Sequence, residues 1–219
     1  GDMVAVHASD GSLMAYGHYQ IGSIAVRVLS FDDSVLRPDF FEVMLSRALQ
    51  VRVACGLHGS EDTTCYRLVH GEGDNLPGLV IDIYGKTAVM QAHSVGMHCD
   101  RKIIAESLKQ VMGETITSIF YKSETTLPFK AQLDAQNDYI IGSYNTNIAI
   151  ENGLKFHVDW LKGQKTGFFV DQRENRSLLE KYSNGRNVLN MFCYTGGFSF
   201  YAMRGNANLV HSVDSSSKA

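Results

Sequence analysis

The sequence predicts two fold classes in succession, α+β over residues 1–150 and α/β over residues 151–219. In the first part, short apolar runs separated by Gly-, Asn- and Asp-rich turns outnumber helical segments, which favours strands around few helices. Residues 186–218 show another order: an apolar run, a Gly-Gly turn, a segment with helical spacing and a second apolar run. That order predicts a strand–helix–strand unit of about 30 residues.

The composition is that of an ordinary globular chain of 219 residues, which can hold one large domain or two smaller ones. All apolar runs are shorter than the roughly 18 residues of a membrane span, and the start GDMVAVHASDG lacks the features of a signal peptide. A net charge of −3 does not indicate nucleic-acid binding, although Arg47, Arg52 and Arg67 could form a local basic patch.

Cysteine usage indicates neither a disulfide framework nor a metal site. The four cysteines form no C-x-x-C pair and show no Cys/His spacing typical of zinc ligands. We therefore expect no metal, free thiols and a cytoplasmic location. The cysteines are Cys55, Cys65, Cys99 and Cys193.

Residues 1–56 are expected to form three strands and one helix. The helix, Pro38–Ala54, has its apolar residues on one face and ends before Gly56. We interpret it as a connector between domains, with Arg47 and Arg52 on its solvated face. Alternating apolar residues predict strands at 3–8, 13–20 and 23–31.

Residues 57–150 are expected to form strands around one amphipathic helix, Arg101–Met112. Acidic and histidine side chains cluster after the first of these strands and could form an active site. A solvated hairpin with a turn-capping Asp is the favoured interpretation. These side chains are His70, Glu72, Asp74 and Asp82. The strands are expected at 65–70, 79–84, 87–93, 115–121 and 138–141, followed by a hairpin of 147–151 and 155–160.

The segment Gly163–Val170 fits neither a regular strand nor an amphipathic helix. Asp171 is expected to cap the following helix, 172–182, with Glu174 completing a capping box. A buried strand is expected at 187–192, and a turn at 193–197 leads into a helix at 198–204. A second strand, 209–213, ends on Asp214.

The turn at 193–197 suits a nucleoside-containing cofactor. Gly196 and Gly197 allow close backbone approach, and the next helix begins with free N–H groups. Asp214, about 20 residues past the turn, is placed to accept hydrogen bonds from ribose hydroxyls. Because Phe192 and Tyr194 replace the glycines of a dinucleotide fingerprint, a cofactor without phosphates is favoured. The alternative is a crossover that binds no ligand.

Two motifs carry a resemblance to known families. N-M-F-C-Y-T-G-G-F-S resembles motif I of class I S-adenosylmethionine-dependent methyltransferases. Q-K-T-G-F-F-V-D-Q-R-E-N-R resembles the signature of the large-subunit ribosomal RNA (cytosine-C5) methyltransferases that carry a PUA domain. The resemblance implies S-adenosylmethionine as cofactor and RNA as partner. It implies a cofactor site formed by Lys165, Thr166, Gly167, Phe168, Asp171, Gln172, Arg173, Asn190, Phe192, Cys193, Tyr194, Thr195, Gly196, Gly197 and Asp214.

The resemblance also implies a domain organisation. GDMVAVHASDGSLMAYGHYQ and IAVRVLS resemble the last strands of a PUA β-barrel, and YRLVHGEGDNLPGLVIDIYG resembles the family's central domain. The expected parts are the end of a PUA-like domain (1–33), a linker helix (34–56), a central α+β domain (57–150) and the first part of an incomplete Rossmann-like methyltransferase domain (151–219). We expect the chain to be truncated at both ends, since it starts without Met and stops five residues past Asp214.

The family's catalytic Cys and Asp-Pro-Pro loop follow the second strand of the methyltransferase domain, so the resemblance implies no catalytic residue in this chain. Cys193 is a poor candidate because it lies in the cofactor turn. Lys122-Ser123-Glu124 departs from the family's Arg-Ser-Asp, which puts the substrate-facing role of that segment in doubt. The alternatives are a non-catalytic RNA-binding module and a nucleotide-dependent oxidoreductase. Residues 160–219 are expected to be poorly ordered in isolation, or covered by another copy in a homodimer or by more chain.

Overall fold

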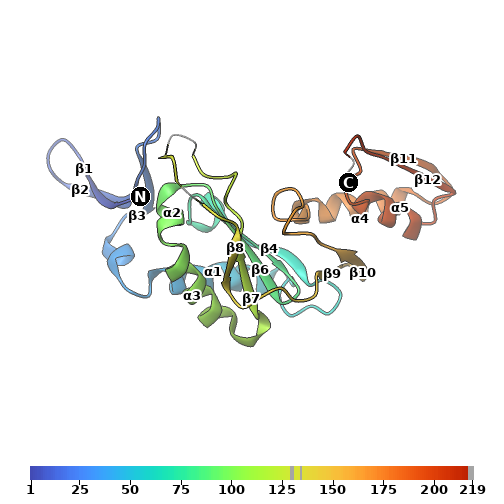
Figure 1. Cartoon of the computed structure of the whole chain (residues 1–219), viewed down its shortest axis with the longest axis horizontal. Coiled ribbons are helices and arrows are strands. Elements are labelled where there is room, and N and C mark those ends of the chain that lie inside the picture. The colour runs from blue at the N-terminus through green and yellow to red at the C-terminus, as the bar shows by residue number, and fades with distance from the viewer. Residues whose placement is uncertain (129–130, 134, 217–219) are drawn as a thin grey trace.

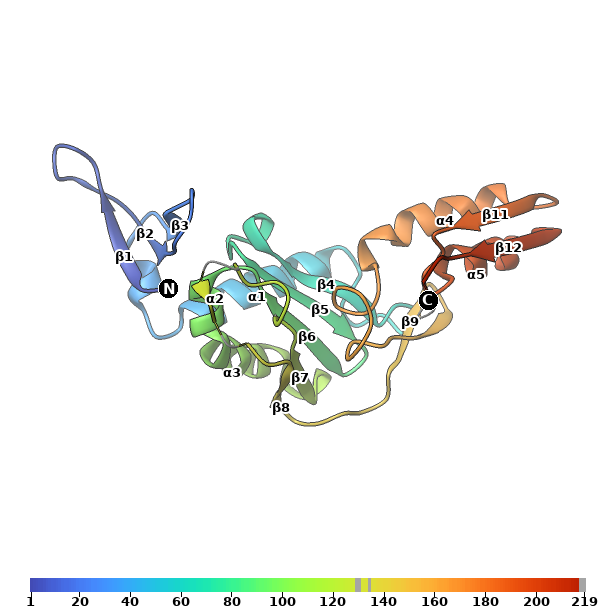
Figure 2. The same ribbon diagram turned by 45° about the horizontal axis from the view of Figure 1, so that its top comes forward.

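The computed structural model describes residues 1–128, 131–133 and 135–216. Figure 1 shows an elongated molecule in which an N-terminal sheet, a central sheet with its helices and a C-terminal group of helices and strands follow one another. Figure 2 shows the same three parts in a row. The last three residues of the predicted methyltransferase segment lie outside the described residues. Within the described residues, no helix combines the length and apolar character needed to cross a membrane.

The N-terminal sheet contains three antiparallel strands in the order β1-β2-β3. It is an open sheet in the described residues, so a closed β-barrel is not present. His18 of β2 attaches the sheet to the central part, since its Nε2 lies 3.0 Å from Oδ2 of Asp100. The strands are β1 (Met3–His7), β2 (Leu13–Tyr19) and β3 (Val26–Ser30), followed by the short 3-10 helix η1 (Asp33–Leu36).

The central sheet has five strands in the order β4-β5-β6-β7-β8. β6 and β7 are parallel and the other neighbours are antiparallel. A parallel pair needs a crossover, which two helices provide here. The strands are β4 (Cys65–His70), β5 (Leu79–Tyr84), β6 (Thr87–Ala92), β7 (Ser118–Tyr121) and β8 (Asp138–Ile141). The helices are α2 (Val95–Cys99) and α3 (Arg101–Met112), with 3-10 turns η2 (Gly71–Asp74) and η3 (Gly113–Thr115).

Both faces of the central sheet are covered, and alternation along β5 shows how. Ile81 and Ile83 belong to the core beneath α1 (Phe40–Ala54) and α3. Tyr84 faces the opposite core, formed with the next hairpin and the segment up to Val170. Because α1 buries Leu45 completely in the first core, it is part of this layer rather than a free connector. The domain boundary at residue 56 stays a prediction.

The C-terminal part begins with a hairpin of β9 (Ile148–Glu151) and β10 (Leu154–His157). Asn152 and Gly153 have φ values of 47° and 79°, as a two-residue hairpin turn requires. The 3-10 turn η5 (Val170–Gln172) leads into α4 (Arg173–Tyr182). The predicted strand–helix–strand unit is confirmed as parallel β11 (Asn187–Met191) and β12 (Leu209–Val213), joined by α5 (Gly197–Arg204).

Two local predictions about this part are wrong. No side chain caps α4, because η5 already turns the backbone and places Asp171 inside a helical turn instead of before it. The predicted capping box with Glu174 is therefore absent. β11 is not a buried strand, since α5 packs against one face of the β11–β12 pair and Leu189 on the other face is 63% exposed.

Candidate cofactor site

The turn after β11 has an unusual backbone. Phe192 and Tyr194 have φ values of 57° and 47°, a left-handed conformation that non-glycine residues rarely adopt, and Gly196 has a φ of 74°. The backbone N–H of Cys193 donates to the carbonyl of Val213 at 3.2 Å, which fixes the turn to the end of β12. For non-glycine residues such as Phe192 and Tyr194, this conformation costs of order 1–3 kcal/mol each, and such residues concentrate at functional sites. The turn is therefore the first candidate site.

Asp214 is held beside this turn by backbone N–H groups. Its Oδ2 accepts from the N–H of Tyr194 at 2.9 Å and its Oδ1 accepts from the N–H of Ser216 at 2.8 Å. The N–H of Ser216 and then that of Tyr194 lower the pKa of Asp214, so the carboxylate is ionised at neutral pH. A carboxylate has about four lone-pair sites, so capacity for further donors such as hydroxyl groups remains.

Gly196 and Gly197 begin α5 without a side-chain cap. The first N–H groups of a helix have no partner within the helix, so this end suits an acceptor. Gly197 also has a packing role. A Cβ there would lie 3.2 Å from Cδ of Arg176 and 3.5 Å from Cε2 of Phe168, so a larger residue would be tight.

Tyr194 joins the two motifs that the sequence singled out. Its hydroxyl accepts from the N–H of Gln164 at 2.9 Å and donates to the carbonyl of Gly167 at 3.3 Å. Its ring meets the ring of Phe169 edge-on, with centroids 5.6 Å apart. Although about 30 residues separate them in the chain, the loop 163–168 and the turn 192–197 form one structural unit.

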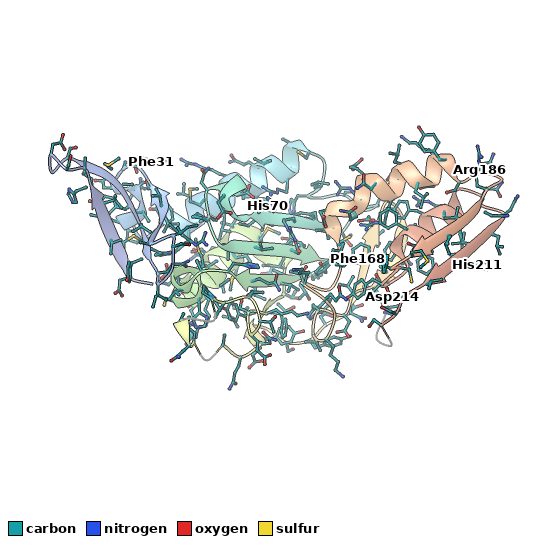
Figure 3. All side chains as sticks on the ribbon, turned by 90° about the horizontal axis from the view of Figure 1, so that it is seen from above. Phe31, His70, Phe168, Arg186, His211 and Asp214 are labelled. Atoms are coloured by element: carbon teal, nitrogen blue, oxygen red, sulfur yellow. The ribbon has the colours of Figure 1, made fainter. Side chains whose placement is uncertain are left out.

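Some predicted site residues lie away from the turn. Thr166 and Phe168 are buried against the central sheet, where the Thr166 hydroxyl donates to Oδ2 of Asp82 at 2.6 Å. Figure 3 shows Phe168 at the junction between the central sheet and the C-terminal helices. Asn190 binds within the unit, donating through Nδ2 to Oγ of Ser199 at 2.8 Å. Lys165 is exposed with a φ of 51°.

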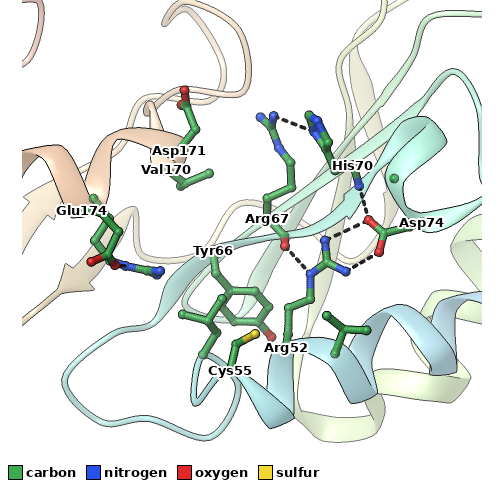
Figure 4. Close-up of a pocket in the computed structure, with 13 residues that line it drawn as sticks. Arg52, Cys55, Tyr66, Arg67, His70, Asp74, Val170, Asp171 and Glu174 are labelled. Atoms are coloured by element: carbon green, nitrogen blue, oxygen red, sulfur yellow. Dashed lines mark hydrogen bonds and ion pairs between the residues drawn. The ribbon is translucent and has the colours of Figure 1, made fainter.

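Asp171 and Arg173 line a different cavity, of about 420 Å³, between α4 and the central sheet (Figure 4). Arg173 places its Nε 3.2 Å from Glu174, which also lines this cavity. The facing wall carries Arg67 and His70. None of the described residues lining it belongs to the turn 192–197. The structure thus brings the turn, Asp214 and the loop 163–167 together and leaves 171–173 on a neighbouring surface.

Comparison with known proteins identifies the family. The sequence profile of S-adenosylmethionine-dependent methyltransferases matches residues 67–218. The chain belongs to this family, and S-adenosylmethionine is the family's cofactor. The family is not that of the nucleotide-dependent oxidoreductases, which the sequence had left open.

Similar proteins include "Ribosomal RNA large subunit methyltransferase I" of Aeromonas hydrophila, 39% identical over all of this chain and 55% of the relative. The protein of the same name from Photobacterium profundum is 37% identical over the same shares. The chain spans about half the length of the curated relatives it matches. A Streptococcus mutans protein assigned as a SAM-dependent methyltransferase has a TM-score of 0.84 over 99% of this chain and 56% of its own. A crystal structure with SAH bound gives the same TM-score over 55% of its chain, and at 24% identity both support the fold alone.

Sequence reasoning missed the paired charges behind the site. Asp82 is fully buried and receives two hydrogen bonds from Arg67, so the expected solvated hairpin is wrong at this position. Asp74 forms an ion pair with Arg52, whose guanidinium bonds to both carboxylate oxygens of Asp74. Arg52 therefore faces the sheet instead of solvent. A single Asp in the otherwise apolar strand LVIDIY was the signal that a partner had to exist.

A second buried ion pair lies behind α5. Arg176 donates to both carboxylate oxygens of Glu151 at 2.7 Å, and the Tyr201 hydroxyl donates to Oε1 of Glu151 at 3.0 Å. The Arg176 guanidinium also lies 4.6 Å from the ring centroid of Phe168. Both charged side chains are almost wholly buried. Since Glu151 lies on β9, Arg176 on α4 and Tyr201 on α5, these bonds connect the β9–β10 hairpin to both helices.

Proposed function

We propose that the full-length protein containing this chain methylates large-subunit ribosomal RNA at cytosine C5, using S-adenosylmethionine. The printed names of the relatives support RNA as the substrate class. The cytosine-C5 specificity rests on the signature in residues 164–176 alone. Because the chain spans about half of those relatives, activity is assigned to the whole protein. A cytoplasmic location accompanies this substrate.

The observation that carries the proposal is the strained turn held beside ionised Asp214. When bound, the cofactor supplies a methyl group on a sulfonium centre. Asp214 would accept hydrogen bonds from the ribose hydroxyls, and the start of α5 would face the methionine portion. Phe192, 81% exposed, offers an apolar surface. The proposed cofactor-binding set is Lys165, Thr166, Gly167, Phe168, Asp171, Gln172, Arg173, Asn190, Phe192, Cys193, Tyr194, Thr195, Gly196, Gly197 and Asp214.

Arg173 is proposed to pair with the cofactor carboxylate, since a guanidinium can bind a carboxylate through two parallel bonds. Its Nε donates to Oε1 of Glu174 at 3.2 Å. Replacing Arg173 with Lys would retain the charge and lose the two-pronged geometry. We expect weaker S-adenosylmethionine binding by calorimetry. Equal affinity would assign Arg173 to the ion pair with Glu174 alone.

The remaining assignments concern parts of the whole protein. We propose that 1–33 belongs to a PUA-like RNA-binding domain, 34–56 connects it to the central domain 57–150, and 151–219 starts the methyltransferase domain. Cytosine C5 is a weak nucleophile, so C5 chemistry requires a Cys thiolate that adds to C6. We place that Cys and its Asp-Pro-Pro loop outside these 219 residues.

Asp214 provides the test of the cofactor site. Replacing it with Ala removes a charged acceptor for ribose hydroxyls, which we expect to weaken S-adenosylmethionine binding about ten- to a hundred-fold. Isothermal titration of the full-length protein measures this. The neighbouring Ser215→Ala variant is the matched control and should bind normally. If Asp214→Ala binds like the wild type, the assignment of this carboxylate is wrong.

The reaction itself is tested with labelled S-adenosylmethionine and large-subunit ribosomal RNA. We expect label in RNA and 5-methylcytosine after nucleoside digestion and mass spectrometry. Label in another nucleoside would support methylation of RNA but disprove cytosine C5 as the methylated position. Cofactor binding without transfer to any RNA would disprove the proposed substrate class.

A further inference from the structure

The loop Gly163–Phe168 is held between the central sheet and the cofactor turn. We propose that Asp82 and Tyr84, two residues on the same face of β5, are positioning residues for the S-adenosylmethionine site. Both side chains bind one side of this loop, and the other side of the loop binds the hydroxyl of Tyr194. The inference rests on the proposed cofactor site and extends it to the central sheet, which carries no motif for the cofactor.

Asp82 provides a fixed, charged anchor. Its side chain is fully buried, and Arg67 donates to Oδ1 at 2.8 Å and to Oδ2 at 3.0 Å. A buried carboxylate is tolerated when its charge is paired in this way. Its Oδ2 also accepts the hydroxyl of Thr166 at 2.6 Å. In this contact the Thr166 hydroxyl is the donor, so its proton points to Asp82.

Tyr84 holds the next stretch of the loop. Its hydroxyl accepts from the N–H of Phe168 at 3.2 Å, lies 3.0 Å from the carbonyl of Phe168 and lies 2.9 Å from Oγ1 of Thr166. The Tyr84 ring is 1% exposed and stacks parallel to Trp160 with centroids 6.3 Å apart. A single rigid phenol therefore satisfies buried polar groups of two loop residues.

The opposite side of the loop contacts the cofactor turn. The N–H of Gln164 and the carbonyl of Gly167 both bind the Tyr194 hydroxyl, and the N–H of Tyr194 binds Asp214. The approach at Gly163 is close enough to require glycine, because a Cβ there would lie 2.2 Å from the carbonyl oxygen of Asp159 and 2.6 Å from the Tyr194 hydroxyl. A continuous set of contacts thus runs from the buried anchor on β5 to the proposed ribose acceptor.

Lys122 secures the start of the same loop. Its Nζ donates to the carbonyl of Gly163 at 2.6 Å. Lys122 follows β7, so a second strand of the central sheet contributes to the placement. Sequence comparison left the role of the segment around Lys122 in doubt, and this contact assigns it to loop placement. A loop that is already placed costs less free energy to order when the cofactor binds.

The experiment uses the full-length protein, isothermal titration with S-adenosylmethionine and thermal unfolding without ligand. Tyr84→Phe removes one oxygen from the network. We expect it to weaken S-adenosylmethionine binding about fivefold, as loss of one hydrogen bond predicts. The matched control is Tyr121→Phe on β7, whose buried hydroxyl binds Nδ1 of His98 at 2.6 Å. This control should lower the melting temperature comparably and leave affinity within about twofold.

A double variant tests whether the effect passes through the loop. In a Thr166→Val background, Tyr84→Phe should weaken binding by less than about twofold, because the network is already broken. A full additional fivefold loss would overturn the inference, as would equal affinities of Tyr84→Phe and the wild type. If Tyr84→Phe does not fold, Lys122→Met tests the same loop, because the half-buried Lys122 side chain binds the carbonyl of Gly163. An unchanged affinity of Lys122→Met for S-adenosylmethionine would then overturn the inference. Wild-type protein that does not bind the cofactor would overturn the proposed site as well.

Discussion

Cys65 and Cys55 are free thiols in opposite environments. Cys65 is 1% exposed on β4, and its Sγ donates to the carbonyl of Ile150 at 3.4 Å. Burial, and then the nearby Glu151 carboxylate, raise the pKa of Cys65 to about 12. Cys55 is exposed at the end of α1. Since the thiolate is the reactive form, the two cysteines should differ in reactivity.

We predict that brief treatment of the folded 219-residue chain with iodoacetamide near pH 8 modifies Cys55 and Cys99 and spares Cys65. Cys99 is exposed like Cys55, so it is the internal control. Peptide mass spectrometry gives the extent at each site. Modification of Cys65 at a rate similar to that of Cys99 would mean that β4 opens readily, which contradicts its place in the core.

The neighbours of single residues could be predicted from sequence only where one regular strand–helix–strand unit links the residues. The position of Asp214 beside the turn that contains Gly196 and Gly197 followed from the sequence, because the spacing predicts a strand, a turn and a second strand. The role of Thr166 could not be found this way. Its partner Asp82 lies 84 positions away, and only the packing of the loop on β5 brings the two together. The same holds for Arg52, whose partner Asp74 is 22 positions distant.

Among the elements, α4, α5 and the β9–β10 hairpin depend on one buried ion pair. Glu151 and Arg176 are at most 3% exposed in their side chains. By contrast, Arg204 of α5 pairs with Glu180 of α4 at the surface, where the side chains are 34% and 26% exposed. Removing one member of a buried pair leaves an unpaired buried charge, whereas a surface pair contributes little.

We predict that Arg176→Met destabilises the chain by about 3–5 kcal/mol. Arg204→Met, the matched control, should cost less than about 1 kcal/mol. Urea unfolding followed by the fluorescence of Trp160, the chain's single tryptophan, measures both. Similar midpoints for the two variants would show that the buried pair contributes no more than the surface pair.

Element positions followed well from local patterns, whereas their environments did not. The bounds of β4 and β5 match the prediction because apolar alternation and flanking turns are local signals. The prediction that β11 is buried failed, since burial depends on what covers a strand. The prediction of a side-chain cap on α4 failed because η5, a 3-10 turn, gave no separate signal in the sequence. Local patterns therefore specify an element better than they specify its neighbours.

At the scale of the whole molecule, buried phenols and a buried thiol set a limit on alkaline stability. Burial raises the pKa of Tyr66 to about 12, and burial followed by the charge of Asp82 raises the pKa of Tyr84. These groups lose protons near their ordinary values of 9.0 to 10.0 once the chain unfolds. The folded state then binds more protons than the unfolded state, so stability falls as pH rises.

We predict that the free energy of unfolding falls as the pH rises from about 9 toward 12. Tyr66→Phe removes one of the contributing groups and should make the fall between pH 8 and pH 11 shallower by about 1.4 kcal/mol. The control is Tyr182→Phe, because the Tyr182 side chain is 72% exposed. Urea midpoints at pH 8 and pH 11 give the comparison. Equal slopes for wild type and Tyr66→Phe would contradict the assignment.

The arrangement of the molecule also leaves one apolar face open. In the parallel register Leu189 pairs with His211 and Met191 pairs with Val213, so these residues share the face that points away from α5. Leu189, Met191 and Val213 are 63%, 49% and 44% exposed. Each of the two strands also has one edge without a strand neighbour in the described sheet. Apolar faces and open edges of this kind recruit partners.

We predict that residues 1–219, expressed alone, self-associate through this face. Light scattering should give a mass that rises with concentration above the 24.3 kDa of one chain. Leu189→Lys places a charge in the centre of the face and should shift the mass toward the monomer. Val53→Lys on α1, where Val53 is 52% exposed, adds the same charge elsewhere and should not change the association. A monodisperse monomer at all concentrations, or equal effects of the two lysines, would show that the β11–β12 face does not mediate contacts.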